Sequence, residues 1–201
     1  MLKVGLTGSI AVGKTTVCGL FRELGCHVLD ADVVAREAVE PGTVGLHRVV
    51  EHFGEGILLD DGSLDRAALG KIIFADAEQR MVLNSIIHPL VLERQDEWLA
   101  EVEKADPKAI AIVDAALMIE SGGYKRFNKI IVVWCNADIQ ISRLMARNGI
   151  LRQEAEQRIA AQMPQDEKKK FADLLIDTSD GFETTRLQTV GIHRQLLGLI
   201  E

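Results

Sequence analysis

A glycine-rich segment near the start of the chain has the residue types and the spacing that hold phosphate groups. Residues 8–15 read Gly-Ser-Ile-Ala-Val-Gly-Lys-Thr and fit the pattern G-x-x-x-x-G-K-[ST] at every fixed position. The glycines let backbone N–H groups turn toward phosphate oxygens, and the helix expected after the loop adds the positive end of its dipole. Lys14 is expected to reach the β- and γ-phosphates of ATP, and the Thr15 hydroxyl to ligate Mg²⁺. The residues predicted to bind the nucleotide are Gly8, Ala11, Val12, Gly13, Lys14, Thr15 and Thr16.

Three aspartates follow apolar runs that are expected to form buried strands. Asp30 and Asp32 come after residues 26–29, and Asp114 comes after residues 110–113. Ligands of parallel α/β sheets bind beyond the carboxyl ends of the strands, and side chains two residues apart on an extended chain point the same way. One of the first two carboxylates is expected to orient an acceptor hydroxyl and accept its proton, and Asp114 is expected to hold Mg²⁺ through a water molecule. A helix cap or a turn is the alternative role for each of these aspartates.

Arginines follow the fourth apolar run of the chain. Arg143 and Arg147 are four residues apart on a predicted helix and therefore share one face, and Arg152 and Arg158 follow a break at Gly149. Guanidinium groups on a mobile lid would close over a nucleotide and stabilise charge on the transferred group. A solvated helix surface is the alternative.

Strand and helix patterns alternate along the chain, which is typical of an α/β fold with a parallel sheet. A long, mainly helical stretch follows the second strand and is interpreted as an inserted region beside the sheet. Pro89 is expected to break a helix there and to give His88 an extended conformation, in which the histidine binds a substrate or takes a buried structural role. Strands are predicted at 3–7, 26–29, 109–113, 129–135 and 174–176, and helices at 43–52, 65–74, 76–87, 90–104 and from the last strand to about residue 200.

Composition limits the classes of partner. The net charge of −7 gives the chain as a whole no basic surface for nucleic acid, and no apolar stretch approaches the roughly 20 residues needed to cross a bilayer. The N-terminus lacks the apolar region of a signal peptide, and three cysteines without metal-ligand spacing indicate buried thiols in a reducing compartment. We therefore expect a cytoplasmic protein without nucleic-acid or membrane partners. We expect the run Lys168, Lys169 and Lys170 to form a solvated face.

Motifs along nearly the whole chain resemble those of the dephospho-CoA kinase family. Residues 30–42 are the most specific part, because other P-loop kinases do not share this stretch. It contains Asp30-Ala31-Asp32, Ala35-Arg36 and Glu40-Pro41-Gly42. The other segments that carry the resemblance are Leu6-Thr7-Gly8 with the glycine loop, His88-Pro89-Leu90, Asp114 through Glu120, Arg143, Arg147, Gln162, Ala172-Asp173 and Ile176-Asp177.

The resemblance implies a kinase that transfers the γ-phosphoryl group of ATP-Mg²⁺ to the 3′-hydroxyl of dephospho-CoA, the last step of coenzyme A synthesis. It implies that Asp32 is the base and that Arg36 and His88 belong to the acceptor side. Another small-acceptor kinase, for nucleoside monophosphates or shikimate, and a nucleotide-binding switch without phosphotransfer are the alternatives. The residues predicted to be catalytic are Asp32, Lys14, Arg143 and Arg147, and those predicted to bind the acceptor are Asp32, Arg36 and His88.

The patterns and the resemblance together predict a P-loop NTPase three-layer α/β sandwich with a five-stranded parallel sheet, a helical substrate-binding insert and a helical lid. Val12 stands where the family usually has Ser, Ala116 where it usually has Pro, and Thr178 where it usually has Asn. The resemblance places the loop at residues 176–177 near the adenine of ATP. We expect a monomer or a small homo-oligomer. The predicted regions are a nucleotide-binding core at 1–32, 109–142 and 172–201, a helical CoA-binding region at 33–108 and a lid at 143–171.

Overall fold

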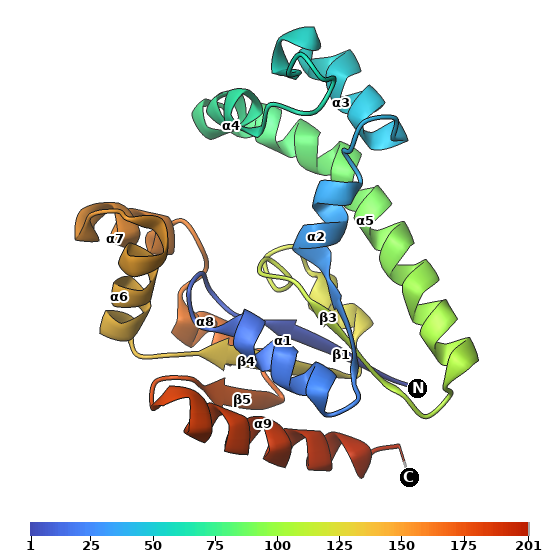
Figure 1. The fold of residues 1–201 in the computed structure, drawn as a ribbon, viewed down its shortest axis with the longest axis vertical. Helices are drawn as coiled ribbons and strands as arrows, with labels where there is room; N and C mark the ends of the chain where they lie inside the picture. The colour runs from blue at the N-terminus through green and yellow to red at the C-terminus, as the bar shows by residue number, and fades with distance from the viewer. Residues whose placement is uncertain (201) are drawn as a thin grey trace. The chain divides into compact units, whose positions relative to one another are not determined.

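The computed structural model describes residues 1–200, in which one or more helical segments separate each strand from the next (Figure 1). The chain forms two compact units: the first unit is Met1–Asp30 together with the chain from Leu99 onwards, and the second unit is Ala31–Trp98. The strands are β1 (Leu2–Thr7), β2 (His27–Asp30), β3 (Ile110–Asp114), β4 (Lys129–Trp134) and β5 (Leu174–Asp177). The helices are α1 (Lys14–Glu23), α2 (Ala31–Glu37), α3 (Val44–Phe53), α4 (Arg66–Ala75), α5 (Ala77–Ala105), α6 (Ala137–Asn148), α7 (Arg152–Ala160), α8 (Gln165–Lys169) and α9 (Gly181–Leu197), with short 3-10 turns at η1 (Glu55–Ile57) and η2 (Gly123–Arg126).

The first unit is built on a five-stranded parallel sheet, as the sequence predicts, and its strand order is β2-β3-β1-β4-β5. Every residue of β3 is buried, which is expected of a parallel strand that is covered on both faces. The register pairs Asp114 with Leu6 of β1 and with Asp30 of β2. The carboxyl ends of the strands therefore bring these two aspartates to the edge of the sheet from which the glycine loop leaves β1.

Both faces of the sheet are covered. On one face, Phe21 of α1 and Leu196 of α9 are fully buried in a cluster with strand side chains. A buried side chain of this size stabilises the fold by roughly 1.5–3 kcal/mol relative to an exposed one. On the other face, Gly5 of β1 packs beneath Met118, and a Cβ at Gly5 would lie 2.5 Å from the sulfur of that methionine. The sheet is therefore the middle layer of a sandwich, as predicted.

The second unit has a hydrophobic core of its own. Thr43 caps α3, because its hydroxyl oxygen accepts a hydrogen bond from the Leu46 N–H at 3.1 Å. Asp65 caps α4 by accepting hydrogen bonds from two backbone N–H groups, both at 2.9 Å. Gly45 allows α3 to approach the end of α2, since a Cβ there would clash with the Ala38 carbonyl oxygen. The buried members of its main cluster are Val39, Leu46, Val49, Ile57, Leu64, Leu69 and Leu83.

The long helix α5 runs through Pro89, so the predicted helix break at this residue is wrong. A proline inside a helix costs about 3 kcal/mol, because it removes a backbone hydrogen bond and crowds the preceding turn. Leu83 and Val91 are buried on either side of the proline, and burial at roughly 1.5–3 kcal/mol for each side chain offsets this cost. His88 is consequently helical and exposed, and the predicted extended conformation is wrong as well.

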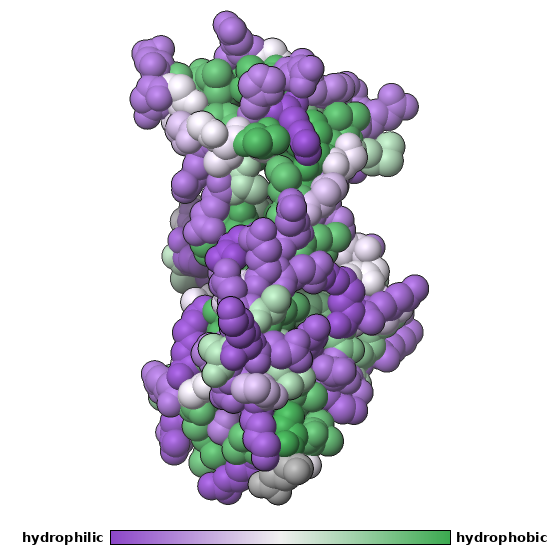
Figure 2. All heavy atoms as spheres, turned by 90° about the vertical axis from the view of Figure 1, so that its right-hand side faces the viewer, coloured by the Kyte–Doolittle hydropathy of each residue, from purple (hydrophilic) through white to green (hydrophobic). Residues whose placement is uncertain are grey.

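Hydrophilic side chains cover most of the face shown in Figure 2, and apolar side chains lie between them in smaller groups. Helix α5 has 29 residues, yet charged side chains are spread along it. None of the helices within residues 1–200 combines the length and the apolar character that crossing a membrane requires.

Candidate active site

A cavity of about 220 Å³ lies at the glycine loop between β1 and α1. Gly13 has φ 91°, and Ala11 has φ 61°, in the left-handed region that residues with a Cβ seldom adopt. Successive backbone N–H groups in such turns form concave sites for anions. Gly8 packs against β4, where a Cβ would clash with the Val133 carbonyl oxygen, and neither Gly8 nor Thr16 lines the cavity. The lining residues are Ser9, Ala11, Val12, Gly13, Lys14, Thr15, Arg143 and Arg147.

The Lys14 ammonium lies beside the Asp114 carboxylate at the end of β3. Lys14 Nζ is 3.7 Å from Asp114 Oδ1, and the two side chains are 15% and 10% exposed. The Cys18 thiol on α1 donates a hydrogen bond to Asp114 Oδ2 at 3.4 Å. Burial, and secondly the Asp114 charge, raise the pKa of Cys18 far above its usual range, so the thiol keeps its proton and stays a donor. The carboxylate is therefore held between a cation and a thiol.

The oxygen donors near the loop suit a magnesium ion. Within residues 1–200, no group of three His, Cys, Asp or Glu side chains is placed to hold a metal ion. Mg²⁺ commonly takes one or two protein oxygens and completes its octahedron with water and substrate phosphates. The Thr15 hydroxyl in the first turn of α1 and the Asp114 carboxylate at the end of β3 are donors of this kind.

Three glutamines tie the glycine loop to the helical region that follows β4. Gln162 Oε1 accepts hydrogen bonds from the Ser9 hydroxyl and from the Ile10 N–H, both at 2.8 Å. Gln140 Nε2 donates to the Ile10 carbonyl at 2.7 Å, and Gln165 Nε2 donates to Gln140 Oε1 at 2.8 Å. These contacts satisfy polar groups of the loop and fix its backbone. Of the three glutamines, only Gln162 is among the residues that carry the family resemblance in the sequence.

Lys168 is buried beneath the site, so the predicted solvated face is wrong for this lysine. Its side chain is 0% exposed, and Nζ donates hydrogen bonds to the Ala116 carbonyl and to Glu120 Oε2, both at 2.8 Å. Burial lowers the pKa of Lys168, and the Glu120 carboxylate opposes this shift. Gln165, three residues earlier on α8, also turns inward, whereas Lys170 is exposed. A run of three lysines gives no sequence signal for which one faces the interior.

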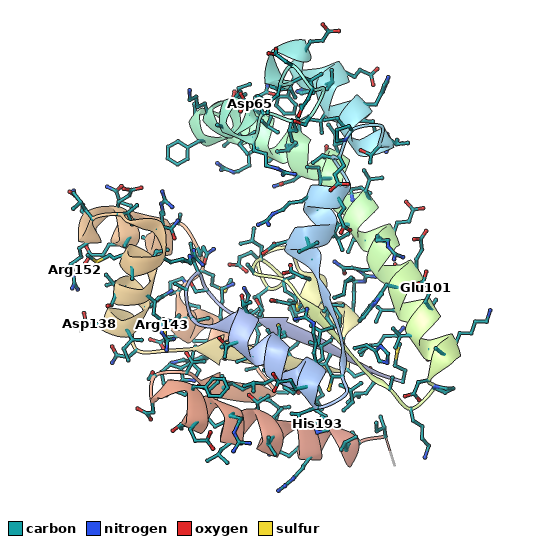
Figure 3. The ribbon with its side chains drawn as sticks, viewed as in Figure 1. Asp65, Glu101, Asp138, Arg143, Arg152 and His193 are labelled. Carbon is teal, nitrogen blue, oxygen red and sulfur yellow. The ribbon has the colours of Figure 1, made fainter. Side chains whose placement is uncertain are left out.

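Two arginines of α6 line the cavity from the helical region. Arg143 Nη1 donates to Thr178 Oγ1 at 2.8 Å, and Arg143 Nη2 donates to the Thr178 carbonyl at 2.7 Å. Arg147 is exposed and lines the same cavity. Arg152, at the start of α7, lies on the surface and is bonded to Asp138 at 3.0 Å (Figure 3). The arrangement thus places two guanidinium groups at the glycine loop and leaves the third outside the cavity.

The three residues predicted on the acceptor side lie in the second unit. Asp32 and Arg36 are four residues apart on α2, His88 is on α5, and all three are exposed. The expectation that Asp32 lies on extended chain is wrong, because α2 already begins at Ala31. Asp32 is instead an acidic residue in the first turn of a helix, where the helix dipole favours a carboxylate.

The second unit also contains a cavity of about 270 Å³ with a mainly apolar lining. None of the three predicted acceptor residues lines it. The lining residues are Val34, Glu37, Ala38, Thr43, Val44, Gly45, Leu90 and Arg94.

The sheet and the loop together define the class of protein. A glycine loop follows the central strand β1, opens the helix α1, and carries a lysine beside a carboxylate at the end of β3. This arrangement is that of a P-loop NTPase, the class that includes the P-loop kinases. The chain belongs to the dephospho-CoA kinase family, since a family model described as "Dephospho-CoA kinase" matches residues 2–183.

Relatives match nearly the whole chain. The dephospho-CoA kinase of Geobacter metallireducens is 44% identical over 195 residues, which cover 97% of this chain and 96% of the relative. A solved structure from Thermus thermophilus has a TM-score of 0.83 at 30% identity and covers 96% of both chains. The dephospho-CoA kinase structure from Campylobacter jejuni has a TM-score of 0.73 at 25% identity, with coverage of 98% of this chain and 97% of that one. The similarity therefore includes the helical second unit as well as the sheet.

Proposed function

We propose that this chain phosphorylates the 3′-hydroxyl of dephospho-CoA with ATP and releases coenzyme A and ADP. The observation that carries the proposal is the cavity at a complete glycine loop, in which Lys14 lies beside Asp114 and Arg143 and Arg147 complete the lining. Membership of the dephospho-CoA kinase family supports this acceptor.

The phosphates of ATP bind to the loop N–H groups and to the amino end of α1. Lys14 brings a compact positive charge to the β- and γ-phosphates. Arg143 and Arg147 stabilise the negative charge on the transferred group, because fixed cations lower the energy of the transition state more than that of the ground state. These three side chains are the proposed catalytic cations.

Mg²⁺ fits the oxygen donors of the first unit. We assign it to the Thr15 hydroxyl directly and to Asp114 through a water molecule. When bound, the ion neutralises part of the charge on the β- and γ-phosphates. Contacts with Cys18 and Lys14 restrict the orientation of the Asp114 carboxylate.

Asp32 accepts the proton of the 3′-hydroxyl. The hydroxyl oxygen forms a bond to the γ-phosphorus, the bond from this phosphorus to the β–γ bridging oxygen breaks, and ADP leaves. Arg36 is one helical turn from Asp32 on α2, and its guanidinium binds the anionic part of the acceptor. His88 on α5 is the further proposed contact to the acceptor.

We also propose that the protein acts in the cytoplasm. Cys18, Cys26 and Cys135 are free and buried, and burial raises the pKa of Cys26 to about 12. Protonated, buried thiols fit a reducing compartment. Dephospho-CoA and ATP are the proposed partners, and a monomer or small homo-oligomer remains the prediction for the assembly.

An acceptor panel tests the proposed function. Purified protein with ATP-Mg²⁺ is offered dephospho-CoA, AMP, CMP and shikimate separately, and ADP and coenzyme A are measured. We expect ADP with dephospho-CoA alone, in amounts equal to the coenzyme A formed, and loss of both when Mg²⁺ is chelated. Turnover with a different acceptor would overturn the acceptor, and ATP binding without acceptor-dependent ADP would identify a nucleotide-binding switch.

A further inference from the structure

Thr178 connects the glycine loop to an arginine of the nucleotide cavity. It follows β5 directly and is 4% exposed. Its hydroxyl oxygen accepts a hydrogen bond from Arg143 Nη1 at 2.8 Å and donates one to the Val12 carbonyl at 2.7 Å. The Thr178 carbonyl accepts a second bond from Arg143 Nη2 at 2.7 Å. One residue thus bonds both the loop and the guanidinium.

The direction of these bonds follows from the chemistry of the groups. A guanidinium has only donors, so the Thr178 oxygen must accept from Arg143. The single hydroxyl proton is then directed to the nearest acceptor, the Val12 carbonyl, while the Trp134 carbonyl lies farther away at 3.4 Å. The hydroxyl therefore has no proton left for an acceptor on the adenine ring.

Close packing places this group at the wall of the cavity. A Cβ built on Gly13 would lie 3.4 Å from Thr178 Oγ1 and 3.6 Å from Arg143 Nη1. Gly13 and Arg143 both line the cavity, whereas Thr178 lies behind them and does not. Thr178 is therefore placed to act on the nucleotide through Arg143.

We propose that Thr178 is a positioning residue that fixes the Arg143 guanidinium at the cavity wall before ATP binds. An arginine side chain has many rotamers, and ordering it during binding weakens affinity. The bonds to Thr178 order it in advance, so that ATP meets a guanidinium already in place. This inference relies on the proposed function only in that the cavity binds ATP.

A double-mutant cycle on ATP affinity tests the inference. Isothermal titration calorimetry with ATP-Mg²⁺ compares the wild type with Thr178→Val, Thr178→Ser, Arg143→Met and the variant carrying Thr178→Val and Arg143→Met. We expect Thr178→Val to weaken ATP binding about tenfold, because it removes a hydrogen bond to a charged group and keeps the shape of the side chain. We expect Thr178→Ser to stay within about twofold of the wild type, and Thr178→Val to have no further effect once Arg143 is replaced.

Thr189→Val is the matched control, because it removes another buried hydroxyl, which donates to the Thr185 carbonyl within α9. It should leave ATP affinity unchanged.

Wild-type ATP affinity in Thr178→Val would overturn the inference. Effects of Thr178→Val and Arg143→Met on ATP affinity that multiply in the double variant would overturn it as well. If Thr178→Val does not fold, Thr178→Ala removes the same hydroxyl and takes its place in the cycle. Because the readout is ATP binding, a wild type that binds ATP and fails to phosphorylate dephospho-CoA would overturn the proposed function and leave this inference standing.

Discussion

On the nucleotide side of the proposed site, Lys14, Asp114 and Arg143 are held by ion-pair or hydrogen-bond contacts, although Thr15 and Arg147 are exposed. The proposed acceptor residues are all exposed side chains on helices. In the first unit, Lys14 is 15% exposed and Arg143 is bonded at both Nη atoms. In the second unit, Asp32, Arg36 and His88 are all exposed. The two sides therefore differ in how much of their geometry exists before a ligand binds.

The difference follows from the elements that carry each side. The sheet edge and the sharp glycine loop fix backbone directions, and buried charges keep fixed partners because an unpaired buried charge is costly. Exposed arginine and lysine side chains on helices keep up to about 2 kcal/mol of rotamer entropy each, which a ligand must remove. We expect ATP to bind where Lys14 and Arg143 are already in place, and the acceptor to order the exposed Arg36 and His88 side chains.

The largest expected effect is at the loop lysine. Lys14→Met removes the cation proposed for the β- and γ-phosphates, and we expect kcat/KM to fall about 10³-fold. Affinity for dephospho-CoA should stay within about twofold of the wild type, because Lys14 is proposed to bind the phosphates of ATP and not the acceptor. Steady-state kinetics and calorimetry with dephospho-CoA measure the two quantities. Activity within tenfold of the wild type would contradict the phosphate role of Lys14.

Asp32→Asn is expected to have the next largest effect. In contrast to Lys14→Met, it should impair the acceptor side and leave ATP binding intact. Removing the proposed base should lower kcat about 10²-fold or more and leave the Kd for ATP unchanged. Asp60→Asn, an exposed aspartate in the same unit, is the matched control and should leave both quantities as in the wild type. Near-normal turnover of the Asp32 variant would remove Asp32 from the mechanism.

Lys168 tests whether buried contacts stabilise the nucleotide side. Lys168→Met leaves the Glu120 carboxylate without its ammonium partner, which costs 3–5 kcal/mol for a fully buried pair. Glu120 is 25% exposed, so we expect a loss of about 2 kcal/mol in the free energy of unfolding. Lys170→Met, two residues away and exposed, should change it by less than about 0.5 kcal/mol. Urea unfolding measures the free energy of unfolding of the two variants. Equal decreases would show that the buried Lys168 stabilises the fold no more than the exposed Lys170 does.

The smallest of these effects is expected on the acceptor side. Arg36→Ala should raise KM for dephospho-CoA about tenfold and change KM for ATP little, because an exposed guanidinium contributes one charge-assisted contact to the acceptor. Arg48→Ala, an exposed arginine on α3, is the control. A rise in KM for ATP of the same size would mean that the two sides do not bind their ligands separately.

The sheet and the glycine loop could be predicted because their signals are local. The apolar runs before Asp30 and Asp114 are short and continuous, as buried parallel strands are, and the loop motif needs only eight consecutive residues. The predicted strands agree with the structure within a residue or two at each end, and the predicted parallel sheet is confirmed, whereas the order of its strands was not predicted.

The wrong predictions occur where tertiary packing outweighs a local rule. Pro89 has the local signal of a helix break, yet burial of apolar side chains on both sides of it keeps α5 continuous. Asp32 is predicted to lie on extended chain, but it is helical because α2 begins at Ala31. Lys168 is predicted to be solvated from its charged neighbours, whereas it is buried and its partner Glu120 is 48 residues away in the sequence.

The contacts behind the site could not be predicted for a related reason. Thr178 bonds to Val12 across 166 residues, and Ser9 bonds to Gln162 across 153 residues. No spacing rule connects positions so far apart, because the sheet order alone decides which loops meet. The roles of the individual site residues remain predictions for the experiments above.

The most direct measurement is the position of the phosphoryl group in the product formed from ATP-Mg²⁺ and dephospho-CoA. Mass spectrometry and phosphorus NMR of that product identify the modified oxygen. We predict one new phosphoryl group on the ribose 3′-oxygen, formed together with an equal amount of ADP, and about 10³-fold slower formation of this product by Lys14→Met. Transfer to another hydroxyl, or no transfer by protein that binds ATP, would contradict the proposed function.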